Sequence, residues 1–142
     1  MVANLVNMAE AFDRYNRTYF EGKLPIPMLN LLHSFRTCGY FQYTKGGWFD
    51  RTLYDPIIFM TDYYDFTEKQ FKDILCHEMI HYYLAYIGED RDCNHGKKFK
   101  IMADRLNRTY GLNITPYLDL SKYKRREGTP DLSYWFVKQF YM

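Results

Sequence analysis

Two histidines and a glutamate form the pattern HExxH at residues 77–81, inside an otherwise apolar and aromatic stretch, ILCHEMIHYYLAYI. On a helix, residues four apart lie one turn apart on nearly the same face, so His77 and His81 can bind one metal ion together. Glu78 points about 100° away from His77 and is placed instead to accept a proton from a water that the metal activates. We therefore expect a hydrolytic zinc site with Glu78 as its general base.

The third zinc ligand has to come from another part of the chain, because a catalytic zinc ion has three protein ligands and one open position. His95 follows His81 by 14 residues, beyond a polar loop, GEDRDCN, that can reverse the chain. We expect His95 to be this ligand. The alternatives are the acidic residues of the loop, Glu89, Asp90 and Asp92.

The helix that carries HExxH has well-marked ends. Thr67 and Gln70 form a capping box, and Phe66 and Phe71 have the spacing of a hydrophobic staple, so we expect the helix to begin at Glu68. Gly88 stands where a C-terminal cap glycine would. Asp73, one turn before His77, is a candidate acceptor for the other ring nitrogen of a ligand histidine.

A further helix is predicted at about 95–110, with Asn94 as its N-cap and Gly111 as its stop. On this helix His95 would lie in the first turn and share the face of four apolar or aromatic side chains. These four are Phe99, Met102, Leu106 and Tyr110.

The rest of the chain predicts an α+β fold. Apolar residues at three- and four-residue steps indicate a helix at about 3–20. Strands are expected at 28–35, 39–44 and 57–60, with turns at Gly46-Gly47 and Asp55-Pro56. We divide the chain into a domain over 1–111 and an aromatic and basic tail over 112–142, packed on the same domain. The tail is expected to contain a hairpin at 121–140.

Composition limits the classes to which the protein can belong. Hydrophobic residues make up 47% of 142 residues, which suffices for one domain with a real core and argues against disorder. No apolar run is long enough to span a bilayer, and the amino terminus has no basic leader, so we expect a cytoplasmic protein without a membrane segment. Cys38, Cys76 and Cys93 form no CxxC pair, and we interpret them as reduced thiols.

Charge is distributed unevenly along the chain. Residues 50–94 carry ten acidic and four basic side chains, a net charge of −6, whereas residues 95–126 carry nine basic and two acidic ones, a net charge of +7. Such a basic segment can attract DNA, and a solvated helix face is the alternative interpretation. The basic residues are Lys97, Lys98, Lys100, Arg105, Arg108, Lys122, Lys124, Arg125 and Arg126.

Three segments resemble the SprT-like zinc metallopeptidases, the family that includes the Spartan proteases acting on DNA–protein crosslinks. They are LCHEMIHYYL at 75–84, HGKKF at 95–99 and YNRTYFEGKLP at 15–25. The resemblance covers about residues 15–110 and implies a zincin-like fold, protein substrates, and DNA as an activator or scaffold. It also implies His77, His81 and His95 as zinc ligands and Glu78 as the catalytic acid/base.

The chain departs from the family pattern in two places. Relatives often have HGPxF where this chain has HGKKF, and many carry a cysteine-rich zinc ribbon after the protease domain, whereas here no cysteine follows Cys93. The sequence thus predicts a zinc-dependent endopeptidase that hydrolyses proteins by attack of a zinc-bound water, assisted by Glu78. The alternative is a non-catalytic, zinc-stabilised module that binds nucleic acid or protein.

Overall fold

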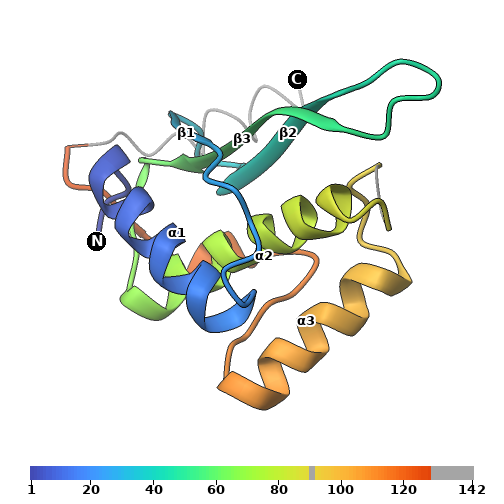
Figure 1. The fold of residues 1–142 in the computed structure, drawn as a ribbon. Coiled ribbons are helices and arrows are strands. Elements are labelled where there is room, and N and C mark those ends of the chain that lie inside the picture. Colours follow the sequence, from blue (N-terminus) through green and yellow to red (C-terminus); the bar gives the residue numbers. More distant parts are fainter. Residues whose placement is uncertain (90–91, 129–142) are drawn as a thin grey trace, which may run out of the picture.

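The protein has an α+β fold with three helices and a small three-stranded sheet. The structure is a computed structural model that describes residues 1–89 and 92–128. Figure 1 shows the sheet lying over α1 and α2, with α3 on the far side of α2. The helices are α1 (Leu5–Tyr19), α2 (Glu68–Tyr86) and α3 (Lys97–Tyr110), and the strands of the sheet are β1 (Met28–Leu32), β2 (Gly39–Lys45) and β3 (Leu53–Thr61).

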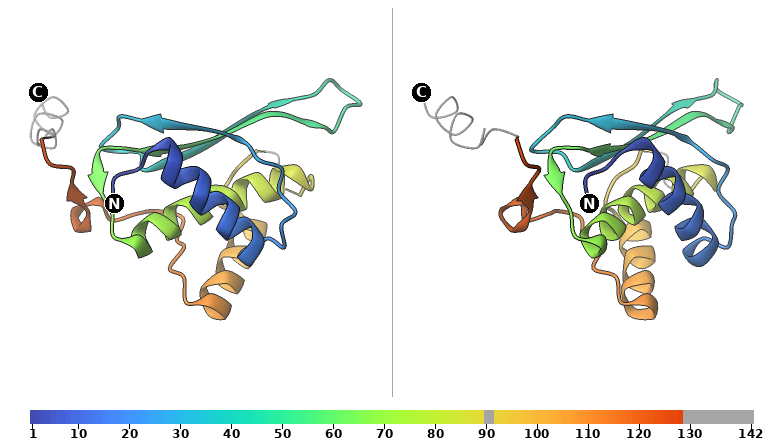
Figure 2. Two further views of the ribbon diagram at one scale, coloured as in Figure 1. Left: turned by 60° about the vertical axis from the view of Figure 1, so that its left-hand side comes forward. Right: turned by 90° about the vertical axis from the view of Figure 1, so that its left-hand side faces the viewer.

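The central helix α2 is buried among the other elements, contacting α1, α3, β2 and β3. Leu75, Cys76, Met79 and Ile80 have no exposed surface. This burial explains why the helix is apolar around its circumference. Figure 2 shows α2 from two further sides, enclosed between the sheet and the other two helices.

Both predicted ends of α2 are confirmed. The side chain of Thr67 accepts a hydrogen bond from the backbone N–H of Gln70 at 3.1 Å, and the side chain of Gln70 accepts one from the N–H of Thr67 at 2.9 Å. The helix ends at Tyr86, and Gly88 follows with a φ of +77°, the left-handed conformation that glycine adopts most easily.

The sheet has the strand order β1-β3-β2, so β2 is an edge strand. Strand β1 runs parallel to β3, and β2 runs antiparallel to it. The predicted strands are confirmed, but the predicted turn at Asp55-Pro56 is wrong, because both residues lie inside β3. The β2–β3 register shifts between Gln42 and Thr44, opposite these residues. Such an irregularity accommodates a proline that has no N–H to donate.

Helix α3 begins two residues later than the sequence predicted. Gly96 is its N-cap, and Asn94 uses its side chain to accept a hydrogen bond from the N–H of Gly96 at 2.8 Å. Asn94 therefore forms a local turn instead of the cap, and His95 lies in the loop before the helix. The predicted stop at Gly111 is confirmed, with a φ of +71°.

Beyond α3, the chain returns across the molecule to the N-terminal end of α2. Its short strand β5 (Lys124–Arg125) pairs antiparallel with β4 (Tyr64–Asp65), after a 3-10 turn at Leu120–Lys122. The residues expected to open a C-terminal hairpin thus pair with a distant segment, and the part of the predicted hairpin from residue 129 onward lies outside the described residues. The division at residue 111 stays a prediction. No helix in the described part of the chain is long and apolar enough to cross a membrane.

Replacing Thr67 by alanine tests the cap of α2. The variant loses the acceptor for the N–H of Gln70, which we expect to cost about 1 kcal/mol of the free energy of unfolding. The melting temperature should then fall by about 4 °C. Thr109→Ala is the control, since Thr109 is an exposed residue inside α3. Equal melting temperatures for the two variants would contradict the role of the cap.

Candidate metal centre

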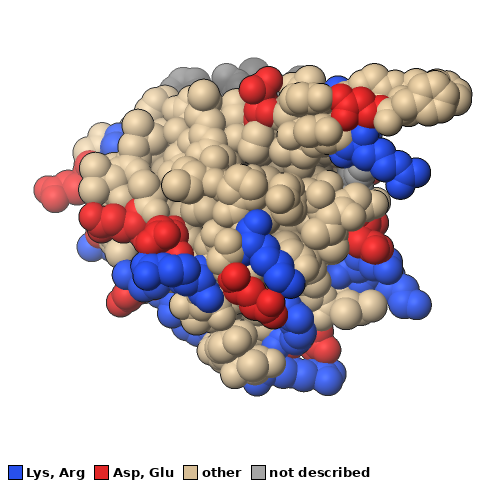
Figure 3. Space-filling model, viewed as in Figure 1, with Lys and Arg blue, Asp and Glu red and all other residues tan. Residues whose placement is uncertain are grey.

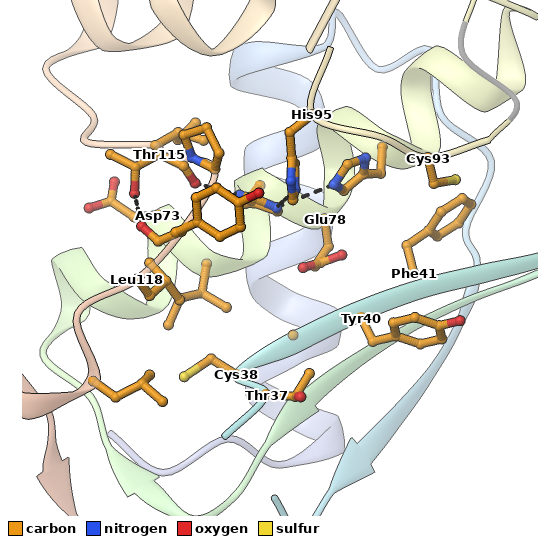
Figure 4. A pocket seen from close by; sticks show the side chains of 18 of the residues that line it. Thr37, Cys38, Tyr40, Phe41, Asp73, Glu78, Cys93, His95, Thr115 and Leu118 are labelled. Atoms are coloured by element: carbon orange, nitrogen blue, oxygen red, sulfur yellow. Dashed lines mark hydrogen bonds between the residues drawn. The ribbon is translucent and has the colours of Figure 1, made fainter. Parts of the chain in front are cut away.

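The imidazole rings of His77, His81 and His95 converge on one point. The Nε2 atom of His77 lies 3.0 Å from Nε2 of His95 and 3.2 Å from Nε2 of His81. One ligand atom from each ring lies within 4.8 Å of the others. Figure 4 shows His95 reaching from the loop before α3 toward the histidines of α2. The three histidines are positioned to bind a metal ion, as the sequence predicted.

A backbone carbonyl fixes the orientation of the His77 ring. The Nδ1 atom of His77 lies 3.0 Å from the carbonyl oxygen of Thr115, and because a carbonyl only accepts, Nδ1 must carry the proton. The Nε2 atom of His77 therefore presents its lone pair to the other two histidines. This is the tautomer that metal binding through Nε2 requires.

The segment that supplies this carbonyl is held by side chains of α2 and α3. Asn107 donates to the carbonyl of Ile114 at 3.0 Å and accepts from its N–H at 2.8 Å, as a neighbouring strand would. Asp73 accepts a hydrogen bond from the N–H of Asn113 at 3.0 Å. Asp73 was expected to accept a hydrogen bond from a ligand histidine. It instead holds the segment that contacts His77.

Burial keeps His77 and His81 neutral. It lowers the pKa of His77 to about 4 and that of His81 to about 3, and repulsion from the neighbouring imidazoles adds to both effects. Imidazoles whose Nε2 atoms converge on one point form a donor set suited to zinc. The site therefore fits the metal that the sequence predicted.

Phe99 packs against all three histidine rings and so holds His95 near α2. Its ring centroid lies 4.7 Å from those of His77 and His81 and 5.0 Å from that of His95. Phe99 is fully buried at the start of α3. The packing of this side chain therefore fixes where the loop before α3 delivers its histidine.

The acidic alternatives to His95 have other partners. Glu89 forms an ion pair with Lys98 at 3.0 Å, and Asp92 forms one with Lys45 at 3.0 Å. Asp90 lies outside the described residues. Among the residues that the structure describes, the group that could hold a metal ion here consists of His77, His81 and His95.

Glu78 lies between the histidines and the edge strand β2 (Figure 4). Only 6% of it is exposed, and this burial raises the pKa of its carboxyl to about 8. A divalent cation bound nearby would lower this pKa, because it favours the carboxylate. The Glu78 carboxyl is thus placed to exchange a proton with a molecule bound beside the histidines.

Gly39 makes room for the Glu78 carboxyl, a role that the sequence did not reveal. A Cβ atom on Gly39 would lie 2.9 Å from Oε1 of Glu78, closer than real Cβ contacts come. The two residues open onto a cavity of about 610 Å³, whose walls are the start of β2, α2, the loop before α3 and residues 113–120. The cavity is large enough for a few residues of a polypeptide.

The expected basic segment is divided between two elements. All nine side chains are exposed, but five lie on α3 and four lie around β5. Arg108 pairs with Asp104, and Arg126 lies 3.6 Å from Asp62. Figure 3 shows positive and negative side chains interspersed over the lower part of the face that contains α3. DNA binding through these residues stays a prediction.

Asn107→Ala tests the support of the His77 contact. Without this side chain the 113–115 segment loses two hydrogen bonds, and the Thr115 carbonyl is no longer held against Nδ1 of His77. We expect the affinity for Zn²⁺ to fall by about 10- to 100-fold, measured by competition with a chromophoric chelator. The control is Asn113→Ala, which removes an exposed amide side chain from the same segment but keeps its backbone N–H. Equal affinities would show that the segment does not orient His77.

Comparison with known proteins agrees with this geometry. No curated protein matches the sequence significantly. A model of the SprT-like family matches residues 8–118, which include most of α1, the sheet, HExxH, His95 and most of the 113–120 wall. Since this match covers most of the chain, the protein belongs to the SprT-like family.

Proposed function

We propose that the protein is a zinc-dependent peptidase that hydrolyses peptide bonds in protein substrates. The observation that carries the proposal is the convergence of three imidazoles beside a buried carboxyl, in a cavity bordered by an edge strand. The SprT-like family is associated with metallopeptidase activity. His77, His81 and His95 are the proposed ligands, and Glu78 is the proposed catalytic residue.

The proposed roles follow from where each group lies. A zinc ion held by the histidines would supply a Lewis acid that polarises the scissile carbonyl and lowers the pKa of water. Glu78 would accept a proton from the attacking water and deliver it to the leaving nitrogen. Its burial excludes competing solvent, and a carboxyl whose pKa is raised toward neutrality can both accept and donate a proton at neutral pH.

Glu78→Gln separates catalysis from metal binding. The amide cannot accept the proton, so we expect the rate of cleavage of an unfolded protein to fall by about 10²- to 10⁴-fold while one zinc ion per chain is retained. His95→Ala, in contrast, should lose zinc. Zinc content is measured by elemental analysis and cleavage by gel electrophoresis. If the zinc-loaded wild type and Glu78→Gln were equally inactive, the proposed activity would be wrong and zinc would have a structural role.

The same assay tests the alternative, a zinc-stabilised module that binds nucleic acid, which the exposed basic residues of α3 favour. Binding to DNA would then weaken steeply with salt and be unaffected by Glu78→Gln. Cleavage measured with and without single-stranded DNA tests the further proposal that DNA activates the peptidase. Absence of DNA binding at low salt would contradict both roles for DNA.

Gly39→Ala tests the space beside Glu78. The new methyl group would displace the Glu78 side chain, and because misplacement by about 1 Å can cost 100-fold in rate, we expect a loss of activity of that order. Gly39 has no positive φ and meets a flexible side chain, so the melting temperature should change little.

Gly47→Ala is the matched control, since nothing lies within 4 Å of a Cβ at that position. Zinc content is measured in both variants. Full activity of Gly39→Ala would show that Glu78 does not need the position that it has in the structure.

A further inference from the structure

The hairpin formed by β2 and β3 carries two exposed aromatic side chains at its tip. Trp48 and Phe49 are each 93% exposed, and their ring centroids lie 6.2 Å apart, edge to face. Figure 1 shows this hairpin projecting well beyond the body of the molecule. A pair of large aromatic side chains displayed in this way indicates a binding surface more than a contribution to stability.

The turn that displays the pair is well defined. The N–H of Asp50 donates to the carbonyl of Gly47 at 2.9 Å, which places Trp48 and Phe49 at the two central positions of a turn. The side chain of Asp50 accepts from the N–H of Thr52 at 2.9 Å. A Cβ atom on Gly46 would lie 2.7 Å from Asp50, so the two strands approach closely at the base of the turn. These contacts hold the backbone of Trp48 and Phe49 in place relative to β2.

Strand β2 connects this tip to the candidate metal centre. It begins at Gly39, beside Glu78, and its other end leads into the turn. In the part of the chain that the structure describes, β2 pairs with β3 alone. The outer side of an edge strand can pair with an extended polypeptide. A chain bound along β2 at the cavity would therefore run toward Trp48 and Phe49.

We propose that Trp48 and Phe49 form an exosite for apolar side chains of an extended polypeptide substrate. The inference rests on the proposed peptidase function. From Gly39 to Lys45 the strand advances six residues, or roughly 20 Å at 3.3 Å per residue, and Gly46 and Gly47 lead on to Trp48 at up to roughly 30 Å, so the exosite meets substrate residues as far as about eight or nine positions from the scissile bond. The site therefore selects unfolded segments long enough to reach the tip.

The charges at the tip favour a polypeptide over an anionic partner. Lys45 forms an ion pair with Asp92, and Asp50 and Arg51 bring opposite charges next to the aromatic pair. A surface for phosphates or anionic lipids needs several basic residues together. Apolar side chains of an unfolded chain match the two rings without requiring such a cluster.

The test uses quenched fluorescent peptides that share one scissile sequence. One peptide has about eight residues. The other two have about 24 residues and differ at positions eight and nine on each side of the cleaved bond, where one carries Phe and Leu and the other carries only Ser and Gly. In Trp48→Ser/Phe49→Ser, we expect kcat/KM for the long apolar peptide, relative to the short one, to fall about ten-fold through KM. The ratio for the Ser/Gly peptide should stay constant.

The control variant is Val6→Ser/Ile26→Ser, which removes two apolar side chains that are 68% and 81% exposed elsewhere on the surface. It should leave all three peptides unaffected. Melting temperatures are compared to verify that both double variants fold. If the tip variant changed the long and short peptides equally, or neither of them, the exosite would be wrong.

Binding gives a second measurement that does not need turnover. Fluorescence anisotropy of the labelled long apolar peptide on Glu78→Gln should show an affinity about ten-fold higher than on the same protein with the tip substitutions. If this difference appears while the wild type cleaves nothing, the exosite stands and the peptidase function fails. Tip-dependent binding to phosphatidylserine vesicles or oligo-dT, with none to the peptide, would overturn the proposal.

Discussion

The structure depends on the convergence of three imidazole rings beside the buried carboxyl of Glu78. An imidazole can bind a metal through Nε2 only if its ring is held in place and its proton lies on Nδ1, away from the centre. For His77 the holding group is the Thr115 carbonyl, which lies 38 positions away in the sequence. The capped helix α2, the loop before α3 and the segment after α3 are all arranged around this requirement.

Much of this arrangement could be predicted because it is encoded locally. The capping box at Thr67 and Gln70 and the glycine at position 88 gave both ends of α2. His95 was identified correctly as part of the cluster, although by an inexact argument, since it precedes α3 instead of lying in its first turn. What brings it inward is the packing of Phe99 beneath the three rings. The family resemblance is confirmed by the match over residues 8–118.

The features that were not predicted depend on backbone atoms or on the absence of a Cβ atom. A carbonyl that accepts from His77 exists at every residue, so no side chain distinguishes Thr115. Gly39 matters because it has no Cβ next to Glu78, and a glycine in a strand can have several causes. Asp55-Pro56 has the composition of a turn, yet the long β2–β3 pairing places it at an irregularity within a strand. Each of these depends on contacts between distant segments.

His81 shows why the partners of the histidines matter as much as their positions. Among the buried side-chain nitrogen and oxygen atoms of the described residues, its Nδ1 is the one without a hydrogen-bond partner. Its Nε2 lies 3.2 Å from Nε2 of His77, and because that nitrogen of His77 carries a lone pair, the distance fits a His81 protonated at Nε2.

Binding a metal through Nε2 would move that proton to Nδ1, whereas His77 keeps its tautomer. Among the described residues that N–H would have no acceptor, whereas the Nδ1 proton of His77 already has one in the Thr115 carbonyl. The two histidines of one motif thus contribute unequally. His77 is prepared for the metal by Thr115, and His81 has to be reorganised by it.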